Sequence, residues 1–336
     1  KSGEIGGYRL TNLLRVNKTT YTAVFVITEG GNDYLENEDI PVSDLVLYNH
    51  DYTGITWNQL IVQENDLLDA NTPAITKLSA LSSGKQKIGS TINLLLTADE
   101  SGYFFEDNSN INNISFSDTS ITVMDLGKGN YSIVYKVDEG DASVVSGAMT
   151  IHIILTDMAG NTCHPYTSLS PNDISIDALR PVITRAYISS TAENVTAGGK
   201  VEITVIADYK GYSASPLTQV NNVSVLNSNL IFSDTGNGLY RFVYTVEADE
   251  GIVSAGNLAI SIVLLDSYGN ESLEFTSLDP NNVTIYTSKP SAAISGTTTI
   301  CTGDSARLTI SFGGFAPWQV ELFDGSSTRI ISNIQD

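Results

Sequence analysis

The feature that most constrains this chain is a strand pattern that returns at a spacing of 109 or 110 residues. Its last occurrence reads Gly-Leu-Tyr-Arg-Phe-Val-Tyr-Thr-Val over residues 238–246, with large apolar side chains at every second position. The same signature strand fills residues 129–137, and a weaker form fills residues 21–27. A period of two predicts a strand that is buried on one face. Because the repeat is longer than a solenoid unit, we expect a tandem array of β-sandwich domains.

Three prolines divide the array into segments. Pro73, Pro181 and Pro290 stand at equivalent places just before a predicted strand, where each restricts the short linker. Because these linkers hold no Gly/Ser tract, they favour a semi-rigid, elongated rod. We predict the C-terminal part of an immunoglobulin-like repeat over residues 1–73, complete repeats over 74–181 and 182–290, and the start of a different immunoglobulin-like domain over 291–336.

Each complete repeat is predicted to be a seven-stranded immunoglobulin-like sandwich, so the chain as a whole is expected to be all-β. Turns rich in Gly, Asn and Asp separate the short alternating stretches, as in sandwiches of this kind. The same series recurs in the second repeat at the same offset. The predicted strands of the first repeat cover residues 75–81, 92–98, 113–116, 120–123, 129–137, 149–155 and 173–177.

Charge and composition exclude several classes of function. The chain has 17 Lys and Arg against 38 Asp and Glu, for a formal net charge of −21. Nucleic acids and anionic membranes require a basic surface, so neither is an expected partner. No apolar run approaches the roughly 18 residues of a membrane span. The abundance of Thr, Ser, Asn and Val is typical of extracellular all-β repeats, and a chain that starts and stops inside repeats is expected to belong to a longer protein.

Catalytic motifs are not found in the sequence, and we predict that the chain is not an enzyme. The three histidines, His50, His152 and His164, occupy non-equivalent places in the repeats. There is no nucleophile elbow, phosphate-binding Gly loop or Cys/His metal spacing. The two cysteines, Cys163 and Cys301, belong to different predicted domains, so we do not expect a bridge between them.

Acidic residues gather at the predicted junctions, which suggests interdomain calcium, because Ca²⁺ takes about 6–8 oxygen ligands. The loops that flank Pro73 offer Asp69, Asp99, Glu100 and Asp157, with Glu29 and Asp33 nearby. Those that flank Pro181 offer Asp138, Glu139, Asp141, Asp177, Asp208 and Asp266. The junction at Pro290 has acids on one side only and carries Lys289, so no ion is expected there. The alternative is that these acids are solvated or form turns, with Asp157 and Asp266 capping a Gly-Asn turn.

The repeats resemble a known group of bacterial domains. The signature strand, the later Leu-x-Asp-x-x-Gly-Asn turn and the Asp-x-x-x-Pro junction resemble bacterial immunoglobulin-like repeats of giant surface adhesins. Residues 300–305 with 314–318 are similar to domains of Bacteroidota surface proteins, including gliding-motility adhesins exported by the type IX system. In the first segment, Asn-His-Asp-Tyr-Thr-Gly at 49–54 departs from the turn motif.

This resemblance implies a role as the structural or adhesive stalk of a cell-surface filament or adhesin. It implies an extracellular location on a bacterial surface, with neighbouring repeats and external surfaces or glycans as partners. The alternative is a carbohydrate-binding module. Sugar modules usually group exposed aromatic side chains, whereas Trp57 and Trp318 are isolated. Tyr103 and Tyr212 recur in one predicted loop and are the candidates for sugar contact.

Overall fold

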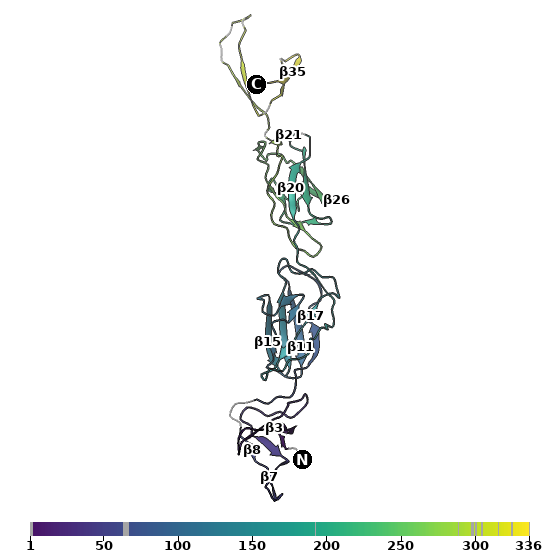
Figure 1. The fold of residues 1–336 in the computed structure, drawn as a ribbon. Helices are drawn as coiled ribbons and strands as arrows, with labels where there is room; N and C mark the ends of the chain where they lie inside the picture. Colours follow the sequence, from purple (N-terminus) through teal and green to yellow (C-terminus); the bar gives the residue numbers. More distant parts are fainter. Residues whose placement is uncertain are drawn as a thin grey trace. The chain divides into compact units, whose positions relative to one another are not determined.

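The computed structural model describes residues 3–62, 67–191, 193–287, 289–296, 299, 301–303, 305–314, 316–323 and 325–335. Ile300, Asp304 and Phe315 of the motifs quoted above lie outside these residues. Within the described ranges the regular secondary structure is entirely β, which confirms the predicted fold class (Figure 1). The chain divides into two compact units, Lys1–Leu179 and Arg180–Asp336, and each is described by itself.

The first complete repeat is a sandwich of a long antiparallel sheet and a layer of shorter pairs, drawn in blue to teal in Figure 1. The long sheet runs in the order β15, β16, β11 and β9, which span Ile121–Gly127, Asn130–Lys136, Thr91–Ala98 and Ile75–Ala80. The opposite layer contains β14 (Ile114–Ser115), β13 (Asn110–Ile111) and β17 (Ile151–His152), the pair β12 (Phe104–Phe105) and β18 (Leu155–Thr156), and the parallel pair β10 (Gly84–Lys87) and β19 (Ile174–Asp177).

The signature strand β16 lies inside the long sheet, and its alternation builds the core. Tyr131 and Tyr135 are fully buried, and they stand opposite Leu96 and Ile92 of β11. Residues of the opposite layer, such as Ile153, close the same apolar cluster. The predicted inward orientation of the tyrosines is therefore confirmed.

The second complete repeat has the same long sheet, in the order β20, β22, β27 and β26. Its signature strand places Tyr240, Phe242 and Tyr244 in the core, 109 residues after their counterparts. The long-sheet strands span Ile183–Ile188, Lys200–Ala207, Leu239–Thr245 and Leu230–Gly236. The shorter strands are β21 (Asn194–Thr196), β31 (Thr284–Tyr286) and β28 (Ile252–Val253), then β23 (Ser213–Ala214) with β30 (Leu264–Leu265), and β25 (Val223–Ser224), β24 (Gln219–Val220) and β29 (Ile260–Ser261).

The opposite layer differs from the prediction, because its two central strands are each broken. The predicted strand 149–155 is split into β17 and β18, and the strand beside it, which sequence did not reveal, is split into β12 and β13. Both breaks occur at one hydroxyl. Ser109 Oγ accepts a hydrogen bond from the Ile154 amide (3.0 Å) and donates to the Ile154 carbonyl (3.1 Å). A hydroxyl that replaces a ladder partner interrupts the alternation that marks a strand.

The segment before the first complete repeat is a smaller β structure, which we call the head segment (residues 3–62 and 67–73). Its buried hydrophobic residues are few: Tyr8, Ile40, Val42, Leu68 and Ala70. The signature pattern here forms a strand only over Tyr21–Val24 (β4), paired with Thr11–Arg15 (β3). The other strands are β1 (Glu4–Ile5), β2 (Tyr8–Arg9), β5 (Ile40–Ser43) and β8 (Leu60–Ile61) in one sheet, and the hairpin of β6 (Leu45–Tyr48) and β7 (Gly54–Trp57).

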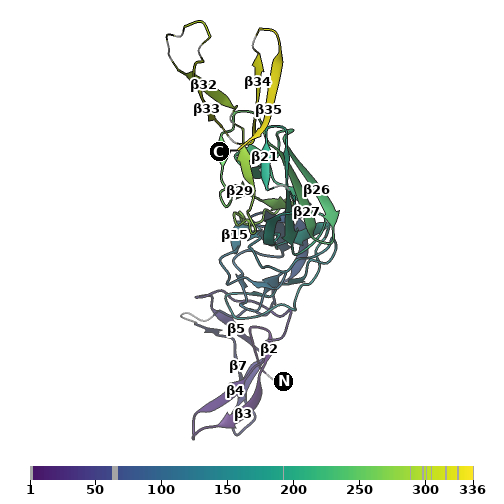
Figure 2. The same ribbon diagram turned by 90° about the horizontal axis from the view of Figure 1, so that it is seen from above.

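The last part of the chain forms two hairpins, which are labelled in Figure 2. The first pairs β32 (Ser291–Ser295) with β33 (Thr309–Gly313), and the second pairs β34 (Trp318–Phe323) with β35 (Thr328–Ile334). The rings of Phe312 and Trp318 stack with centroids 5.5 Å apart, which links the two hairpins.

Candidate functional site

A set of polar contacts that recurs in both repeats lies at the end of each repeat where the linker enters. In the first repeat, Asp99 follows β11. Its Oδ1 accepts hydrogen bonds from the amides of Ala74 (3.0 Å) and Glu100 (3.1 Å) and from the hydroxyl of Tyr103 (3.0 Å). Ala74 directly follows Pro73, so one carboxylate fixes the linker to its domain. We call this arrangement the linker anchor.

The second repeat contains the same linker anchor. Asp208 Oδ1 accepts hydrogen bonds from the Val182 amide (3.0 Å) and the Tyr212 hydroxyl (3.1 Å). Val182 directly follows Pro181. Burial, followed by the hydrogen bond to the neighbouring Asp, raises the pKa of both Tyr103 and Tyr212 well above the ordinary value of 10.0. The two tyrosines therefore act as neutral donors to a carboxylate.

A second set of hydrogen bonds joins the same loop to the signature strand. The Tyr131 hydroxyl accepts a hydrogen bond from the Tyr103 amide (3.0 Å) and donates to the Glu100 carbonyl (3.2 Å). In the second repeat, the Tyr240 hydroxyl accepts from the Tyr212 amide (3.1 Å) and donates to the Tyr209 carbonyl (2.8 Å). The loop that contains Tyr103 or Tyr212 is thus held by two sets of hydrogen bonds, one to the linker-anchor Asp and one to the tyrosine of the signature strand.

Asp157 and Asp266 form the Gly-Asn turn at the same end of each repeat. Asp157 Oδ1 accepts hydrogen bonds from the amides of Ala159 and Asn161, both at 2.9 Å, and its Oδ2 accepts from Asn161 Nδ2 at 2.9 Å. Asp266 makes the same three contacts in the second repeat. In the head segment Asn49 takes this role, with bonds from the amides two and four residues later. The changed motif at 49–54 therefore keeps the turn.

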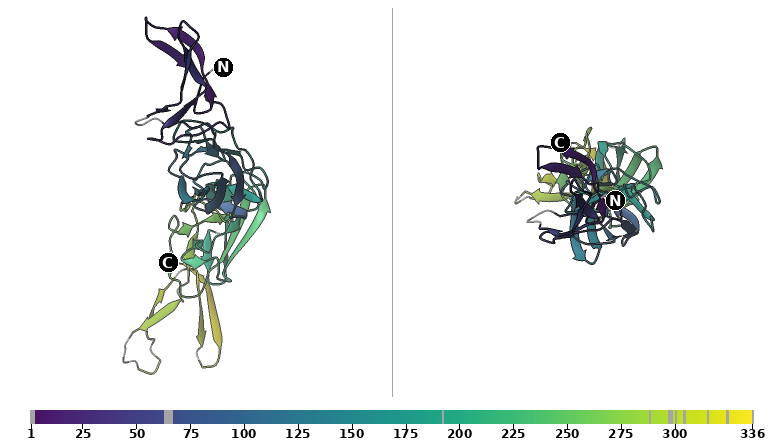
Figure 3. Two further views of the ribbon diagram at one scale, coloured as in Figure 1. Left: turned by 90° about the horizontal axis from the view of Figure 1, so that it is seen from below. Right: turned by 60° about the horizontal axis from the view of Figure 1, so that its bottom comes forward.

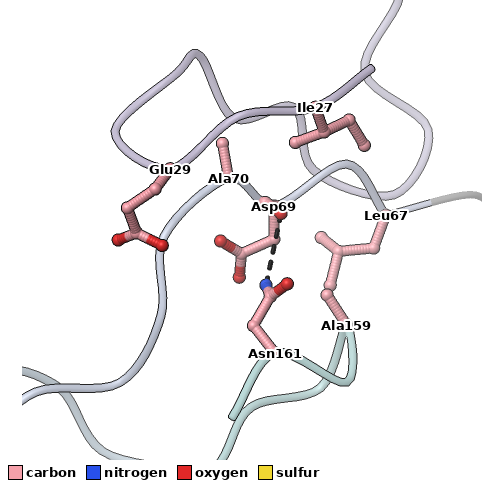
Figure 4. Close-up of a pocket in the computed structure, with 7 residues that line it drawn as sticks. All are labelled: Ile27, Glu29, Leu67, Asp69, Ala70, Ala159 and Asn161. Carbon is pink, nitrogen blue, oxygen red and sulfur yellow. Dashed lines mark hydrogen bonds between the residues drawn. The ribbon is translucent and has the colours of Figure 1, made fainter. Parts of the chain in front are cut away.

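A small open hollow of about 210 Å³ lies where the head segment meets the first repeat (Figure 4). Asn161 Nδ2 reaches across it and donates to the Asp69 carbonyl at 3.2 Å. Asp33 holds the opposite wall through the Ala70 amide (2.7 Å). The hollow is lined by Ile27, Glu29, Leu67, Asp69, Ala70, Ala159 and Asn161.

The structure thus brings some of the predicted calcium ligands together. Asp69 and Asp157 share Asn161 as a donor, and Asp99 anchors the linker between them. The Glu100 amide donates to Asp99. Within the described residues, no group of three or more His, Cys, Asp or Glu side chains is arranged to hold a metal ion. Calcium binding is not tested by these contacts and stays a prediction.

The acids predicted for the Pro181 junction belong to two different units, so each set is described by itself. At the far end of the first repeat, Asp141 Oδ2 accepts hydrogen bonds from the Tyr135 hydroxyl (2.7 Å) and the Asp138 amide (2.8 Å). Asp177 Oδ1 accepts from the Leu179 amide (3.1 Å). Glu139 lies in the same loop. In the second unit, Asp208 and Asp266 have the anchor and turn contacts given above.

Other contacts were missed by sequence reasoning. The carboxylate that pairs with the second signature tyrosine is one: Tyr244 donates to Glu250, as Tyr135 does to Asp141. An acid six residues after that tyrosine in both repeats is a signal that sequence comparison could have used. The hydroxyl of Ser109, which forms hydrogen bonds to both main-chain groups of Ile154, has a counterpart in the second repeat. There the Thr218 hydroxyl donates to the Val263 carbonyl and accepts from the Val263 amide.

The residues considered for catalysis lie apart from one another. His50 is fully exposed and pairs with the adjacent Asp51 at 3.1 Å. His152 lies on β17, and His164 lies in the segment after the Gly-Asn turn. Cys163 Sγ accepts a hydrogen bond from the Leu155 amide (3.1 Å). This hydrogen bond joins the two sides of the Gly-Asn turn, so Cys163 has a structural contact.

No protein-family model matches the chain, and no curated protein matches it. Among solved structures, the I9–I11 tandem of titin is 13% identical, covering 75% of this chain and 94% of that one, with a TM-score of 0.28. The tandem Ig repeats of Dlar are 16% identical (63% and 98% covered, TM-score 0.20), and murine CEACAM1b is 14% identical (63% and 99%, TM-score 0.26). With TM-scores this low, these likenesses carry no argument about function. The described residues contain no helix that is long and apolar enough to cross a membrane.

Proposed function

We propose that the chain is a structural or adhesive stalk, part of a large extracellular filament or adhesin on a bacterial cell surface. Tandem immunoglobulin-like repeats suggest a structural or adhesive module. The finer assignment, to Bacteroidota surface adhesins of the kind exported by the type IX system and used in gliding, has its support in the sequence resemblance alone.

The observation that carries the proposal is that the recurring polar groups of the repeats form hydrogen bonds within the linkers, turns and loops. Asp99 and Asp208 hold linker amides, Asp157 and Asp266 hold turns, and buried tyrosine hydroxyls hold loops. Groups bonded in this way stiffen the end of a domain and its linker. A chain that transmits force between a cell and a surface needs this property.

Single-molecule force spectroscopy of the full chain tests the stalk function. We expect two unfolding events of equal contour length, each on the order of 350 Å for roughly 105 residues at about 3.3–3.6 Å per residue. We expect adhesion in the same instrument when the chain on the tip meets a glass or polysaccharide surface. A chain that extends without discrete events, or that shows no adhesion to any surface, contradicts the stalk or the adhesive part, respectively.

The alternative, a carbohydrate-binding module, has a specific test in Tyr212. Its ring stacks on that of Tyr240 (centroids 6.0 Å apart) and its hydroxyl is held by Asp208. Glycan binding that is lost in Tyr212→Ala, but kept in a variant of an exposed residue such as Leu217, favours a sugar site. Absence of glycan binding by the intact chain contradicts it.

A further inference from the structure

The turn that leads into the signature strand differs between the two complete repeats at one position. In the second repeat, Asn237 stands between two glycines, where the first repeat has Lys128. The turn joins β26 to β27, which are drawn in green in Figure 2 and in the left view of Figure 3. Asn237 is the only asparagine in the sequence that is followed directly by a glycine.

The two turns have the same backbone. Asn237 and Lys128 both have φ of 54°, and both are exposed. The hairpins close on equivalent flanking pairs in the two repeats. Asn-Gly is a favoured sequence for a turn of this kind, but the first repeat forms the same turn with lysine. The turn therefore does not require an asparagine.

The amide of the glycine after this position has a partner in one repeat only. Gly129 donates its N–H to Ser101 Oγ at 2.7 Å. In the second repeat Lys210 stands at the place of Ser101 and has no hydroxyl. The N–H of Gly238 forms no hydrogen bond with any residue that the structure describes, and neither does the side chain of Asn237.

These features together meet the requirements of an intramolecular reaction of asparagine. The main-chain nitrogen of the next residue can attack the side-chain carbonyl carbon, Cγ, when no Cβ on that residue hinders the approach. Glycine meets this condition. Both reacting groups belong to one short stretch of chain, so the attack is a unimolecular step. An N–H without a hydrogen bond loses no partner when its nitrogen reacts.

We propose that Asn237 is a site of spontaneous deamidation, a modification that the corresponding turn of the first repeat cannot undergo. The Gly238 nitrogen forms a bond to Cγ of Asn237. Its proton passes through water to the side-chain nitrogen, which leaves as ammonia. Water then opens the resulting succinimide ring. Cleavage of the bond between nitrogen and Cγ gives aspartate, and cleavage of the bond between nitrogen and the main-chain carbonyl carbon gives isoaspartate.

The two products affect the turn differently. Aspartate leaves the main chain unchanged and tolerates the left-handed conformation. Isoaspartate adds a methylene group to the main chain just before Gly238, where space is limited. The Gly238 carbonyl accepts a hydrogen bond from the Ala207 amide at 2.9 Å, and a Cβ on Gly238 would lie 2.5 Å from the Ala207 carbonyl oxygen. Isoaspartate should therefore displace Gly238 from the end of β22 and loosen the start of the signature strand. This effect is independent of the proposed stalk function.

Peptide mapping of the full chain by mass spectrometry is the first test. After incubation at mildly alkaline pH, we expect the mass change of deamidation to appear at Asn237 before any other asparagine. Chromatography then separates the aspartate and isoaspartate peptides. Asn237→Lys copies the first repeat and should remove the modification without changing the fold, because Lys128 has the same φ.

The amide partner can be exchanged between the repeats. Lys210→Ser places a hydroxyl where the first repeat has Ser101 and should slow the reaction at Asn237 by roughly threefold to tenfold. Conversely, Lys128→Asn creates an Asn-Gly pair in the first repeat. Because Ser101 holds the Gly129 amide there, this pair should react more slowly than Asn237, and Ser101→Ala added to it should accelerate the reaction.

Calorimetry tests the effect on the fold. The melting transition of the second repeat should fall as isoaspartate accumulates, while that of the first repeat stays constant. Asn237→Asp reproduces the other product and should leave both transitions nearly unchanged.

Deamidation at Asn237 that is no faster than at the other asparagines would overturn the proposal. Equal rates in Lys210→Ser and the unaltered chain would overturn the role of the free Gly238 amide. A constant transition of the second repeat despite accumulated isoaspartate would overturn the proposed effect on the signature strand.

Discussion

The two complete repeats share their core position by position, yet they place their polar groups differently. In the first repeat, the Thr156 hydroxyl donates to the carboxylate of Glu106. In the second, Ser215 occupies the place of Glu106 and donates to Glu271, which comes from the segment after the turn, at 3.0 Å. The carboxylate comes from the residue after β12 in the first repeat and from the segment after the Gly-Asn turn in the second, and the residue that follows β12 or β23 forms a hydrogen bond in both repeats.

The same holds at two further positions. Cys163 in the first repeat and Ser272 in the second both accept the amide of the facing leucine, at 3.1 and 3.0 Å. Asp141 and Glu250 both accept a buried tyrosine hydroxyl. The comparison teaches that the sandwich requires a bonding partner at a given place and tolerates several residue types there. The predictions below ask which positions lack that tolerance.

The largest effect is expected at the signature tyrosines. Tyr135 and Tyr244 are fully buried, and truncating a buried aromatic side chain costs about 3–5 kcal/mol. Tyr135→Ala should therefore lower the melting transition of the first repeat, and Tyr244→Ala that of the second, each to the point of near unfolding. Calorimetry of the full chain measures both. Tyr52→Ala, at a residue 88% exposed, is the control, and an unchanged transition for Tyr244→Ala contradicts the shared core.

The next effect concerns the glycines that precede the signature strands. Gly129 and Gly238 have φ of +73° and +75°, and a Cβ would lie 2.2 and 2.5 Å from the carbonyl oxygens of Ala98 and Ala207. We expect alanine at either position to destabilise its repeat by about 2–4 kcal/mol, because strain and a backbone clash add.

Two nearby glycines provide the control for this substitution. Gly127 and Gly236 have φ of +81° and +89° but meet nothing within 4 Å of a Cβ. Alanine there should cost only about 1 kcal/mol, the strain of a left-handed backbone. Denaturant unfolding of the four variants compares them, and equal losses would show that the close approach to the carbonyl is unimportant.

Sequence predicted the elements whose alternation is unbroken. The strands β11 and β16 are eight and seven residues long and pack one face on the core, so period two identified them. The strand split into β12 and β13 was missed because Ser109 inserts its hydroxyl between the two pieces. In the head segment the pattern at 21–27 predicted a strand, but exposure of Tyr21 could not be read from it. Burial depends on the neighbouring strand, which the local pattern does not contain.

The site was predicted less well for a related reason. Asp99 was identified as an exposed loop acid, and its partner Ala74 lies 25 residues earlier. Local turn chemistry did identify Asp157 and Asp266, whose contacts lie within four residues. Long-range hydrogen bonds leave no periodic trace in a single sequence. The sequence signal for these contacts is the recurrence of Asp99 as Asp208, and of Tyr103 as Tyr212, at the spacing of the repeat.

A moderate effect is expected at the linker anchors. Asp99→Ala and Asp208→Ala remove the acceptor of the Ala74 and Val182 amides, at a cost of about 1 kcal/mol each. Amide hydrogen exchange should accelerate at Ala74 in the first variant and at Val182 in the second. Asp99→Asn keeps Oδ1 as an acceptor and should show a smaller change, and Glu274→Ala provides an unrelated acidic control. Unaltered exchange at both amides would mean that the linkers are held by other contacts.

The smallest effect is expected from calcium, which we carry forward as a proposal for the junction at Pro73. All three bonds to Asp99 go to Oδ1, and among the described residues Oδ2 has no bonded donor, so one oxygen is left for an ion. Because Asp157 already accepts three hydrogen bonds, we expect a weak site, with Kd of roughly 10⁻⁴–10⁻³ M. At 1 mM, such a site adds about 0.4–1.4 kcal/mol.

Amide exchange of the full chain with calcium, magnesium or a chelator measures this effect. Calcium should slow exchange over residues 67–74 and leave residues 289–292 unchanged, since Lys289 repels a cation there. Asp69→Asn should abolish the slowing if Asp69 is a ligand. Magnesium should have less effect, because it demands tighter octahedral geometry. Equal slowing at both places, or none at either, would leave these acids in the roles that their hydrogen bonds already show, as anchors of the linker and caps of the turn.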